Sequence, residues 1–556
     1  MWCLLFASTT FAFDTTSHSK FTRQDTLRGS NGRGRSWWDV QHYSLSFSID
    51  TATKSIKGSN TILAKIIDTP ADSLQLDLQE PLELDSIIMN GNKLTFSREG
   101  NVWWIKYPFS NLSVNDSIEL QVFYHGKPRI AKLPPWDGGF IWTKDKNGNP
   151  WIAVACQGLG ASSWWPCKDY QGDEPDEGMN FSIEELKLGD ASVVSNGRGE
   201  MTYFSCHVGS NDDYTTEKSY IFRISNPINT YDLTFYIGHY SSWSFDFEEY
   251  SDTIMGEKGK LDLSFYALRY NEKKARKHFE VTKQMLHCFE YWMGPYPFYE
   301  DGYKLVEAPY LGMEHQSAIG YGNEYKMGYR GSDRSGSGVG MLFDFIIVHE
   351  SGHEWFGNSI TAQDIADNWI HEGFTTYTEA LFAECAFGKE KAFQYTIGEW
   401  KNIRNDKNVI GPYGVNEDGS TDRYDKGSAV IHMIRMIMND DEKFRQLLRG
   451  LNKDFYHKIV TSAQIEQYIN EFAKYNFTPL FNQYLRTTKI PKLEWYIKDK
   501  QLYFRFTDVV EEFSLPIEIK AGKKKETIHP TVDWQNIKWK EGFGIEFSEN
   551  FLIQIK

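Results

Sequence analysis

The feature that most constrains the fold is a segment at residues 341–356 that is apolar on nearly every side. A helix that is hydrophobic all round is buried rather than exposed on a surface. The segment nevertheless carries His349, Glu350 and His353, in the run His-Glu-Ser-Gly-His. Unpaired ionisable groups are costly inside a protein. A buried helix of this composition therefore predicts that specific partners surround these three side chains.

The spacing of the two histidines suits a metal ion. Positions i and i+4 lie on the same face of a helix, so His349 and His353 can point at one ion. Glu350 lies about 100° round the helix and can reach a metal-bound water without being a ligand. Catalytic zinc takes three protein ligands and keeps one position open. Glu372, within a second predicted helix at 369–387, is the candidate third ligand.

The alternative is that these residues match by chance. At this His content, His-Glu-x-x-His is expected by accident in roughly 1 in 40 chains, and a Glu at one fixed spacing lowers this to roughly 1 in 500. The motif also lies on the most apolar segment of the chain, where accidental ionisable groups are disfavoured. The metal interpretation is therefore favoured.

Patterning along the 556 residues predicts several domains and the α+β class. Residues 1–36 are interpreted as a signal peptide and linker. Short alternating strands predict an all-β domain at 37–245, and helical periodicity predicts a mostly helical domain at 246–490. Strands return at 491–556, which predicts a small C-terminal β-sandwich.

The first twelve residues, MWCLLFASTTFA, are apolar and then small. Thr10 and Ala12 fit the −3 and −1 positions of a signal-peptide cleavage site, although the usual basic residues are missing. A disordered tail is the alternative. The six cysteines have no paired spacing, so they predict neither a disulfide framework nor a CxxC metal site, while isolated bridges stay possible. We expect a secreted or periplasmic protein, with a cytoplasmic location as the alternative.

Composition excludes other classes of function. The net charge of −15 argues against nucleic acid, because phosphate binding needs a basic face. No run of about 20 apolar residues exists, so no membrane span is predicted. Hydrophobic residues make up 40% and charged residues 24%, an ordinary globular balance. The sequence predicts no particular oligomeric state.

The run HESGHEWFGNSITAQDIADNWIHEGFTTYTEALFAE at 349–384 resembles the gluzincin aminopeptidases, the family of aminopeptidase N and leukotriene hydrolase. The resemblance extends over nearly the whole chain from Trp37. It includes Tyr-Pro-Phe at 296–298, Gly-Met-Glu-His at 312–315, Tyr-Asp-Lys-Gly at 424–427, and Gln157 ahead of Trp-Pro-Cys-Lys-Asp at 165–169. It implies a thermolysin-like catalytic domain and a zinc metallo-aminopeptidase, with one Zn²⁺ per chain and peptides with a free N-terminus as substrates.

The resemblance also implies a role for individual residues. By this match His349, His353 and Glu372 bind zinc, and Glu350 is the general base that takes a proton from a zinc-activated water.

The remaining roles concern the substrate. Tyr424 matches a tyrosine that stabilises the tetrahedral intermediate. Glu314 matches a glutamate that binds the substrate's α-amine, next to Gly312 and Met313 of the same motif. Gln157 matches a glutamine that lines the same first pocket. Without the family match, these would be ordinary core or surface residues.

The sequence departs from the family pattern at several points. His315 stands where the motif usually has Asn, and His371 stands where Asn is common. Glu379 lies seven residues beyond Glu372, where it could support a ligand or pair with a buried Arg or Lys. The chain ends in β pattern instead of the large helical domain of many members.

Two other functions were weighed. A zinc endopeptidase shares the His-Glu-x-x-His motif, but an amine-binding Glu314 argues against it. An inactive member that serves as a binding or scaffold protein would be expected to have a broken motif, and this motif is intact.

Overall fold

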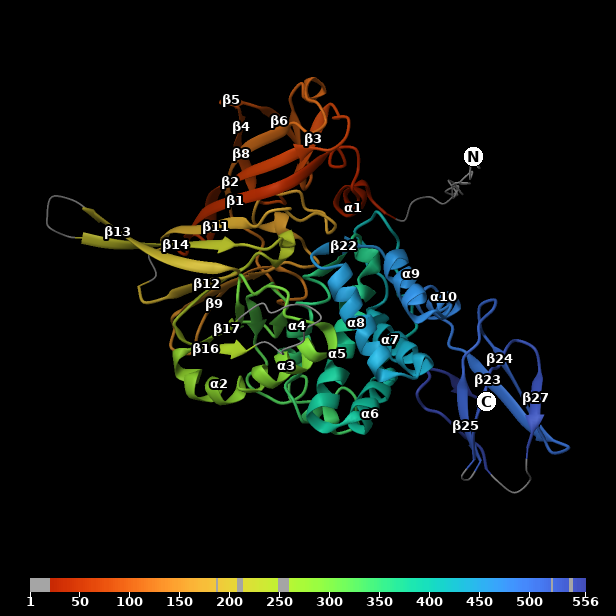
Figure 1. Cartoon of the computed structure of the whole chain (residues 1–556). Coiled ribbons are helices and arrows are strands. Elements are labelled where there is room, and N and C mark those ends of the chain that lie inside the picture. Colours follow the sequence, from red (N-terminus) through yellow and green to blue (C-terminus); the bar gives the residue numbers. More distant parts are fainter. Residues whose placement is uncertain (1–20, 187–188, 208–213, 249–259, 522–523, 540–543) are drawn as a thin grey trace.

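The computed structural model describes residues 21–186, 189–207, 214–248, 260–521, 524–539 and 544–556. Figure 1 shows a β-rich N-terminal region, a mostly helical central region and a smaller C-terminal β region. This is the predicted multidomain α+β class. The predicted signal peptide lies outside the described residues. Within the described part of the chain, no helix has both the length and the apolar character needed to cross a bilayer.

The N-terminal region consists of three sheets. The largest has the order β13 (Arg198–His207), β14 (Tyr214–Ile224), β11 (Met179–Leu186), β1 (Trp38–Asp50), β2 (Ser55–Ile66), β8 (Ser117–Gly126), β4 (Glu83–Met89) and β5 (Asn92–Lys93). A three-stranded sheet has the order β3 (Ser73–Asp77), β7 (Val102–Lys106) and β6 (Thr95–Glu99). A four-stranded sheet has the order β12 (Ser192–Ser195), β15 (Phe235–Gly238), β10 (Pro150–Ala155) and β9 (Gly139–Lys144).

Strand β1 shows why the alternating pattern folds this way. Tyr43, Leu45 and Phe47 are buried while the serines between them are half-exposed, as expected of a strand with one face on the core. Phe47 pairs with Gly58 of β2. A Cβ at Gly58 would lie 2.5 Å from the carbonyl oxygen of Ser46, so only glycine fits at this close approach.

The segment at 21–36 differs from the expected linker. It contains helix α1 (Arg23–Gly29), and Arg35 is fully buried with its Nη2 2.6 Å from Asp77 Oδ2. The backbone N–H of Asn416 in the central region donates to Asp25 O at 2.9 Å. Its polar, Gly-rich composition suggested a linker, but Arg35 pairs with a buried carboxylate of strand β3.

The central region begins earlier than residue 246. Its sheet has the order β16 (Tyr240–Glu248), β17 (Lys260–Leu268), β18 (Tyr303–Glu307), β20 (Ile319–Tyr321) and β19 (Gly312–Met313). Strand β15 still belongs to the N-terminal region, whereas β16 pairs with β17. A boundary at 245/246 would therefore cut through β16. Strand pattern alone does not tell which sheet a strand joins.

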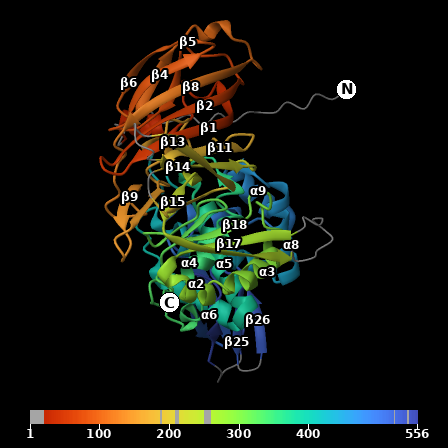
Figure 2. The same ribbon diagram turned by 90° about the vertical axis from the view of Figure 1, so that its left-hand side faces the viewer.

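Helices cover this sheet (Figures 1 and 2), and a second, two-stranded sheet of β21 (Ile360–Ala362) and β22 (Lys458–Val460) lies in the same region. The helices have the following bounds. They are α2 (Glu272–His278), α3 (Val281–Met293), α4 (Phe345–Gly352), α5 (Trp369–Phe387), α6 (Lys389–Glu399), α7 (Asp425–Met438), α8 (Asp441–Asp454), α9 (Ser462–Ala473) and α10 (Thr478–Leu485). The predicted helix at 369–387 has the observed bounds of α5, and it ends at Gly388, whose φ of 94° favours glycine.

Helix α4 is the predicted buried helix, and all eight of its residues are buried. It begins later than the predicted residue 341 because Asp344 caps its start, and it ends at Gly352 instead of the predicted residue 356. The Asp344 side chain accepts hydrogen bonds from the backbone N–H groups of Ile346 and Ile347. Such a cap satisfies donors that the first turn of a helix leaves free.

The C-terminal region is built of two sheets, in agreement with the predicted β-sandwich. Their orders are β27 (Gln535–Lys538), β24 (Gln501–Thr507), β23 (Lys492–Lys498), β29 (Gln554–Ile555), and β26 (Lys524–Ile528), β25 (Ile517–Ala521), β28 (Glu546–Phe547). The side chains of Phe504, Phe506 and Phe513 are buried in its core. The Tyr484 hydroxyl of α10 donates to Leu552 O at 2.7 Å and connects this region to the helices.

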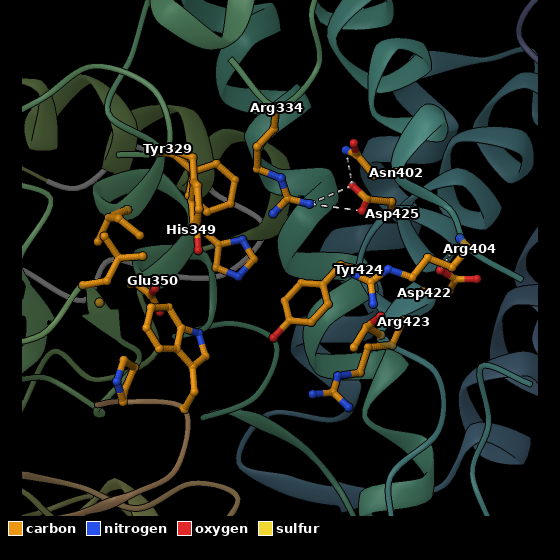
Figure 3. Close-up of a pocket in the computed structure, with 17 residues that line it drawn as sticks. Tyr329, Arg334, His349, Glu350, Asn402, Arg404, Asp422, Arg423, Tyr424 and Asp425 are labelled. Atoms are coloured by element: carbon orange, nitrogen blue, oxygen red, sulfur yellow. Dashed lines mark hydrogen bonds and ion pairs between the residues drawn. The ribbon is translucent and has the colours of Figure 1, made fainter. Parts of the chain in front are cut away.

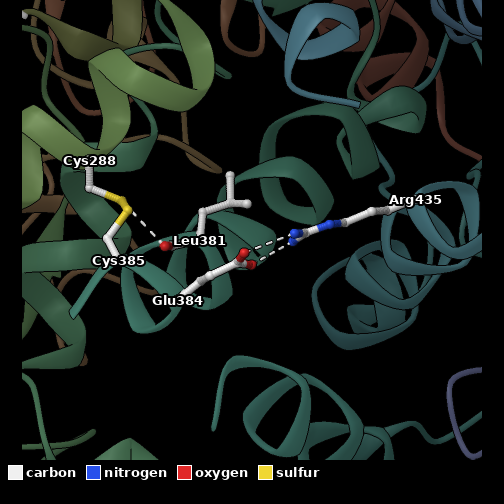
Figure 4. The surroundings of a disulfide bond; sticks show 5 residues. All are labelled: Cys288, Leu381, Glu384, Cys385 and Arg435. Atoms are coloured by element: carbon white, nitrogen blue, oxygen red, sulfur yellow. Dashed lines mark hydrogen bonds and ion pairs between the residues drawn. A yellow bond between two sulfur atoms is a disulfide. The ribbon is translucent and has the colours of Figure 1, made fainter. Parts of the chain in front are cut away.

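One disulfide joins Cys288 of α3 to Cys385 of α5 (Figure 4). Next to it Arg435 of α7 binds both carboxylate oxygens of Glu384, at 2.7 and 3.0 Å. Among the described residues, Cys156 and Cys167 are buried free thiols. The sequence left such an isolated bridge possible but did not indicate its partners.

Candidate active site

Helices α4 and α5 bring three buried side chains together. His349 Nε2 lies 3.6 Å from Glu372 Oε2, and His353 Nε2 lies 3.3 Å from the same oxygen. Gly352 permits this approach, because a Cβ there would lie 2.4 Å from Thr378 Oγ1 of α5. The structure thus gathers the three side chains that the sequence predicted as metal ligands, His349, His353 and Glu372, and this group of side chains is called the metal cluster.

Glu372 Oε2 lies from each of the two histidine nitrogens at the spacing that a tetrahedral zinc ion requires, and all three ligand atoms lie within 4.8 Å of one another. Zinc bonds of about 2.0–2.2 Å to nitrogen and oxygen give ligand–ligand separations of roughly 3.4 Å, close to the observed 3.3 and 3.6 Å. Glu372 Oε2 is buried and has no hydrogen-bond partner. A buried carboxylate oxygen without a partner is unusual, and it fits an atom that coordinates a metal.

Further contacts orient the two imidazoles. His349 Nδ1 lies 2.7 Å from Glu379 Oε1, and Glu379 also accepts from the Tyr395 hydroxyl. His353 Nδ1 lies 3.0 Å from Phe356 O. With the Nδ1 atoms donating to these oxygens, the Nε2 lone pairs face Glu372. The sequence left the role of Glu379 undecided, and the structure places it against His349.

Glu350 lies beside the ligands and on the wall of a cleft. The close approach of strand β19 depends on Gly312, because a Cβ there would lie 2.5 Å from Glu350 Oε1. Burial raises the pKa of Glu350 to about 7, against the opposing charge of His349. A bound divalent cation counteracts such a rise.

Tyr424 reaches the metal cluster from the start of α7. Its hydroxyl donates to Glu372 Oε1 at 2.7 Å, and its ring centroid lies 5.9 Å from that of His349. Helices α5 and α7 approach closely through two glycines, since a Cβ at Gly427 would lie 2.9 Å from Gly373 Cα. This contact brings Tyr424 within one hydrogen bond of a predicted ligand.

Glu314 and Gln157 meet on another side of the cluster. Gln157 Nε2 donates to Glu314 Oε1, and the Tyr231 hydroxyl lies 3.5 Å from the same oxygen. Glu314 is buried directly after the edge strand β19, and burial raises the pKa of its carboxyl. Single ligand atoms of Glu314, Glu350 and His353 all lie within 4.8 Å of one another. The predicted substrate-binding residues are therefore next to the predicted base.

Asn358 also belongs to this side of the site, although the sequence did not indicate it. Its Nδ2 donates to the backbone oxygen of Glu314 at 2.8 Å and so holds the segment that follows β19. No spacing rule connects positions 358 and 314, so only the tertiary structure reveals the contact.

The two unusual histidines are buried and make structural contacts. His315 Nδ1 lies 2.9 Å from the Tyr236 hydroxyl, and burial lowers the pKa of His315 to about 3. His371 Nε2 accepts from the backbone N–H of Ala362 at 2.8 Å, and burial lowers its pKa to about 3 as well. Both imidazoles are therefore neutral at physiological pH.

A cleft of about 500 Å³ opens along the metal cluster (Figure 3). His349, Glu350 and Tyr424 form its inner end, and Arg334 and Asp425 lie farther along it, joined by an ion pair of 3.0 Å. This volume is in the range of small-ligand sites. Residues of the N-terminal region, among them Trp136, complete its wall. The sequence did not identify Arg334, Asp425 or Trp136 as site residues.

The central region of the chain is similar to a known peptidase domain. The peptidase family M1 domain matches residues 277–484. Leukotriene A-4 hydrolase of Xenopus laevis is 23% identical over 462 residues, which span 79% of this chain and 69% of that protein. Aminopeptidase Ey of Gallus gallus is 23% identical over 368 residues, 62% of this chain, and the match spans only 35% of that protein.

Solved structures show the same fold. Native yeast LTA4 hydrolase has a TM-score of 0.63 at 20% identity, covering 81% of this chain and 68% of that one. The M1 zinc metallopeptidase of Deinococcus radiodurans has a TM-score of 0.61 at 20% identity, covering 79% of this chain and 92% of that one. These similarities imply a single catalytic Zn²⁺, for which the residues described above have the right chemistry. The chain is therefore similar to the M1 peptidases, and its residues 277–484 match the peptidase family M1 domain.

Proposed function

We propose that the protein is a zinc aminopeptidase that removes the first residue from peptides with a free N-terminus. The observation that carries the proposal is the buried, hydrogen-bonded pair of Glu314 and Gln157 beside the metal cluster. A substrate ammonium needs a negative partner when it enters a partly desolvated cleft, and a carboxylate gives a strong hydrogen bond. Only one carbon lies between the α-amine and the first carbonyl. Anchoring the amine at Glu314 therefore brings the first peptide bond to the metal cluster.

In this proposal His349, His353 and Glu372 hold the zinc ion, which when bound acidifies a water and polarises a carbonyl. Glu350 takes a proton from the attacking water and passes it to the departing amine. The Tyr424 hydroxyl donates to the carbonyl oxygen as negative charge develops there.

Strand β19 supports the same substrate orientation. It is the edge strand of its sheet, so it has backbone groups free to pair with an extended peptide. Gly312 and Met313 form this strand, and Glu314 follows directly. A peptide that pairs with β19 therefore has Glu314 available for its N-terminal end.

Matched peptides with free and acetylated N-termini test the proposal. Acetylation removes the positive charge and adds bulk where Glu314 lies, so we expect stepwise removal of single residues from the free peptide only. Glu314→Gln keeps the shape of the side chain but removes its charge, and it should reduce the preference for a free amine while zinc stays bound. Efficient internal cleavage of the acetylated peptide would instead identify a zinc endopeptidase. An inactive scaffold protein would cleave neither peptide despite full zinc occupancy.

We also infer a secreted or periplasmic location. The apolar-then-small pattern of residues 1–12 and the Cys288–Cys385 disulfide both support it, because disulfides persist mainly in oxidising compartments. N-terminal sequencing of the protein from its native source should find Phe13 as the first residue. Protein that retains Met1 and contains free thiols at 288 and 385 would contradict the inference.

A further inference from the structure

The N-terminal region contributes an unusually exposed tryptophan to the cleft. The side chain of Trp136 is 62% exposed, although tryptophan is generally well buried in proteins. It lies in the turn between β8 and β9. Asp137 accepts hydrogen bonds from the backbone N–H groups of Lys132 and Leu133, at 2.7 and 2.8 Å. The turn is thus held by its own hydrogen bonds, and the indole is left free to contact another molecule.

Trp136 occupies a boundary between two hollows. One is the cleft that contains Glu350 and Tyr424. The other, of about 650 Å³, runs on past Tyr310 and Tyr325. Trp136 and Leu311 line both of them. An indole in this position is available to contact a ligand in the cleft that Glu350 and Tyr424 also line.

The arrangement of the site indicates which part of a peptide reaches this indole. The amine-binding Glu314 is grouped with His353, whereas His349 and Tyr424 face the cleft. Neither Glu314 nor Gln157 lines the cleft. With the amine at Glu314 and the first carbonyl at the metal cluster, the cleft receives the residues after the scissile bond. Besides Trp136 and Tyr424, its wall carries the aromatic rings of Tyr329 and Phe345.

Building on the proposed aminopeptidase function, we propose that Trp136 is a specificity residue that contacts the side chain of the substrate's second residue and favours an aromatic or large apolar side chain there. Covering an exposed indole with an apolar group removes apolar surface from water and so contributes favourable binding free energy. An aromatic partner contributes further free energy beyond that of burial. The N-terminal region thus determines which second residue of the substrate is preferred. The scissile bond itself lies at the metal cluster of the central region.

The test compares three substrates that share one first residue and carry Phe-amide, Gly-amide or a simple amide after it. Wild-type protein should cleave the Phe substrate with about tenfold higher kcat/KM than the Gly substrate. Trp136→Ala should remove most of this preference by lowering kcat/KM for the Phe substrate about five- to tenfold. Its kcat/KM for the simple amide should stay within about twofold of wild type, because that substrate has no second side chain. Trp136→Phe should retain part of the preference.

Leu133→Ala is the matched control. Leu133 lies in the same turn and is 67% exposed, but it lines neither hollow, so this variant should keep the wild-type ratio. The proposal is overturned if wild type does not distinguish Phe from Gly, if Trp136→Ala keeps the preference, or if both variants lose it equally. Failure of the aminopeptidase function itself would look different, because wild type would then leave the simple amide uncleaved.

Discussion

The metal side and the substrate side of this site are built in different ways. The proposed metal ligands come from one region: His349 lies in α4, His353 directly follows as its C-cap, and Glu372 lies in α5. The proposed substrate side combines Gln157 and Trp136 of the N-terminal region with Glu314, which follows an edge strand of the central sheet. The first arrangement is encoded in helical spacing, whereas the second depends on how two regions pack. Substitutions of the metal ligands should therefore reduce zinc binding, whereas substitutions on the substrate side should change substrate preference and leave zinc bound.

The largest effect should come from removing a metal ligand. Glu372→Ala should lose zinc and activity together, because two histidines alone bind zinc weakly. Metal content and peptide hydrolysis are measured on the same sample, and Glu314→Gln, which should keep its zinc, is the control from the substrate side. Full zinc occupancy in Glu372→Ala would show that Glu372 is not the third ligand.

The next effect separates a base from a ligand on the same helix. Glu350→Gln should keep zinc and lose about 10²–10⁴ in kcat, since an amide cannot take up the proton of the attacking water. Loss of zinc in this variant would mean that Glu350 has a structural role at the metal instead.

Tyr424→Phe tests the contact that joins α7 to the cluster. It removes the hydroxyl that lies 2.7 Å from Glu372 Oε1 but keeps the ring next to His349. Loss of one oxyanion donor typically costs about 10²–10³ in kcat, while KM changes less. A rate within about threefold of wild type would exclude Tyr424 from the chemical step.

A smaller effect is expected one contact farther from the metal. Glu379→Gln keeps the volume of the side chain but removes the negative charge that faces His349 Nδ1. Substitutions of such outer partners typically cost about 10–100-fold in metal affinity or activity. Competition with a chelator measures the affinity, and Glu384→Gln is a control on the same helix, since Glu384 pairs with Arg435 and not with a ligand. Unchanged zinc affinity in Glu379→Gln would show that the hydrogen bond to His349 does not affect the metal.

The same division explains what the sequence could predict. Periodicity gave the bounds of α5, and the i, i+4 spacing on a buried segment placed the two histidines. The sequence pattern could not assign β16 to its sheet, because the alternation of apolar and polar residues in one strand does not identify the strand with which it pairs. Arg35 lies in a polar, Gly-rich segment that looks like a linker, and only its buried contact with Asp77 shows otherwise. Trp136 was missed for the same reason, since its proposed role depends on the cleft that it lines together with Glu350 and Tyr424 of the central region.

The smallest effect on activity is expected at His315, which lies next to Glu314 but faces Tyr236. Burial lowers the pKa of His315 to about 3, so this imidazole carries no charge that could compete with a substrate ammonium between pH 5 and pH 8. His315→Asn should therefore leave the acid limb of the kcat/KM profile where it is in wild type. Stability should respond instead. The unfolded chain binds a proton at His315 near pH 6.5, whereas the folded protein does so only near pH 3. Wild type should therefore lose stability as the pH falls from about 6.5 to about 3. The variant lacks this contribution, so its unfolding midpoint should fall less steeply over the same range. A shift of the activity limb in His315→Asn, with an unchanged stability profile, would mean that His315 is charged in the folded protein and acts on the amine-binding side after all.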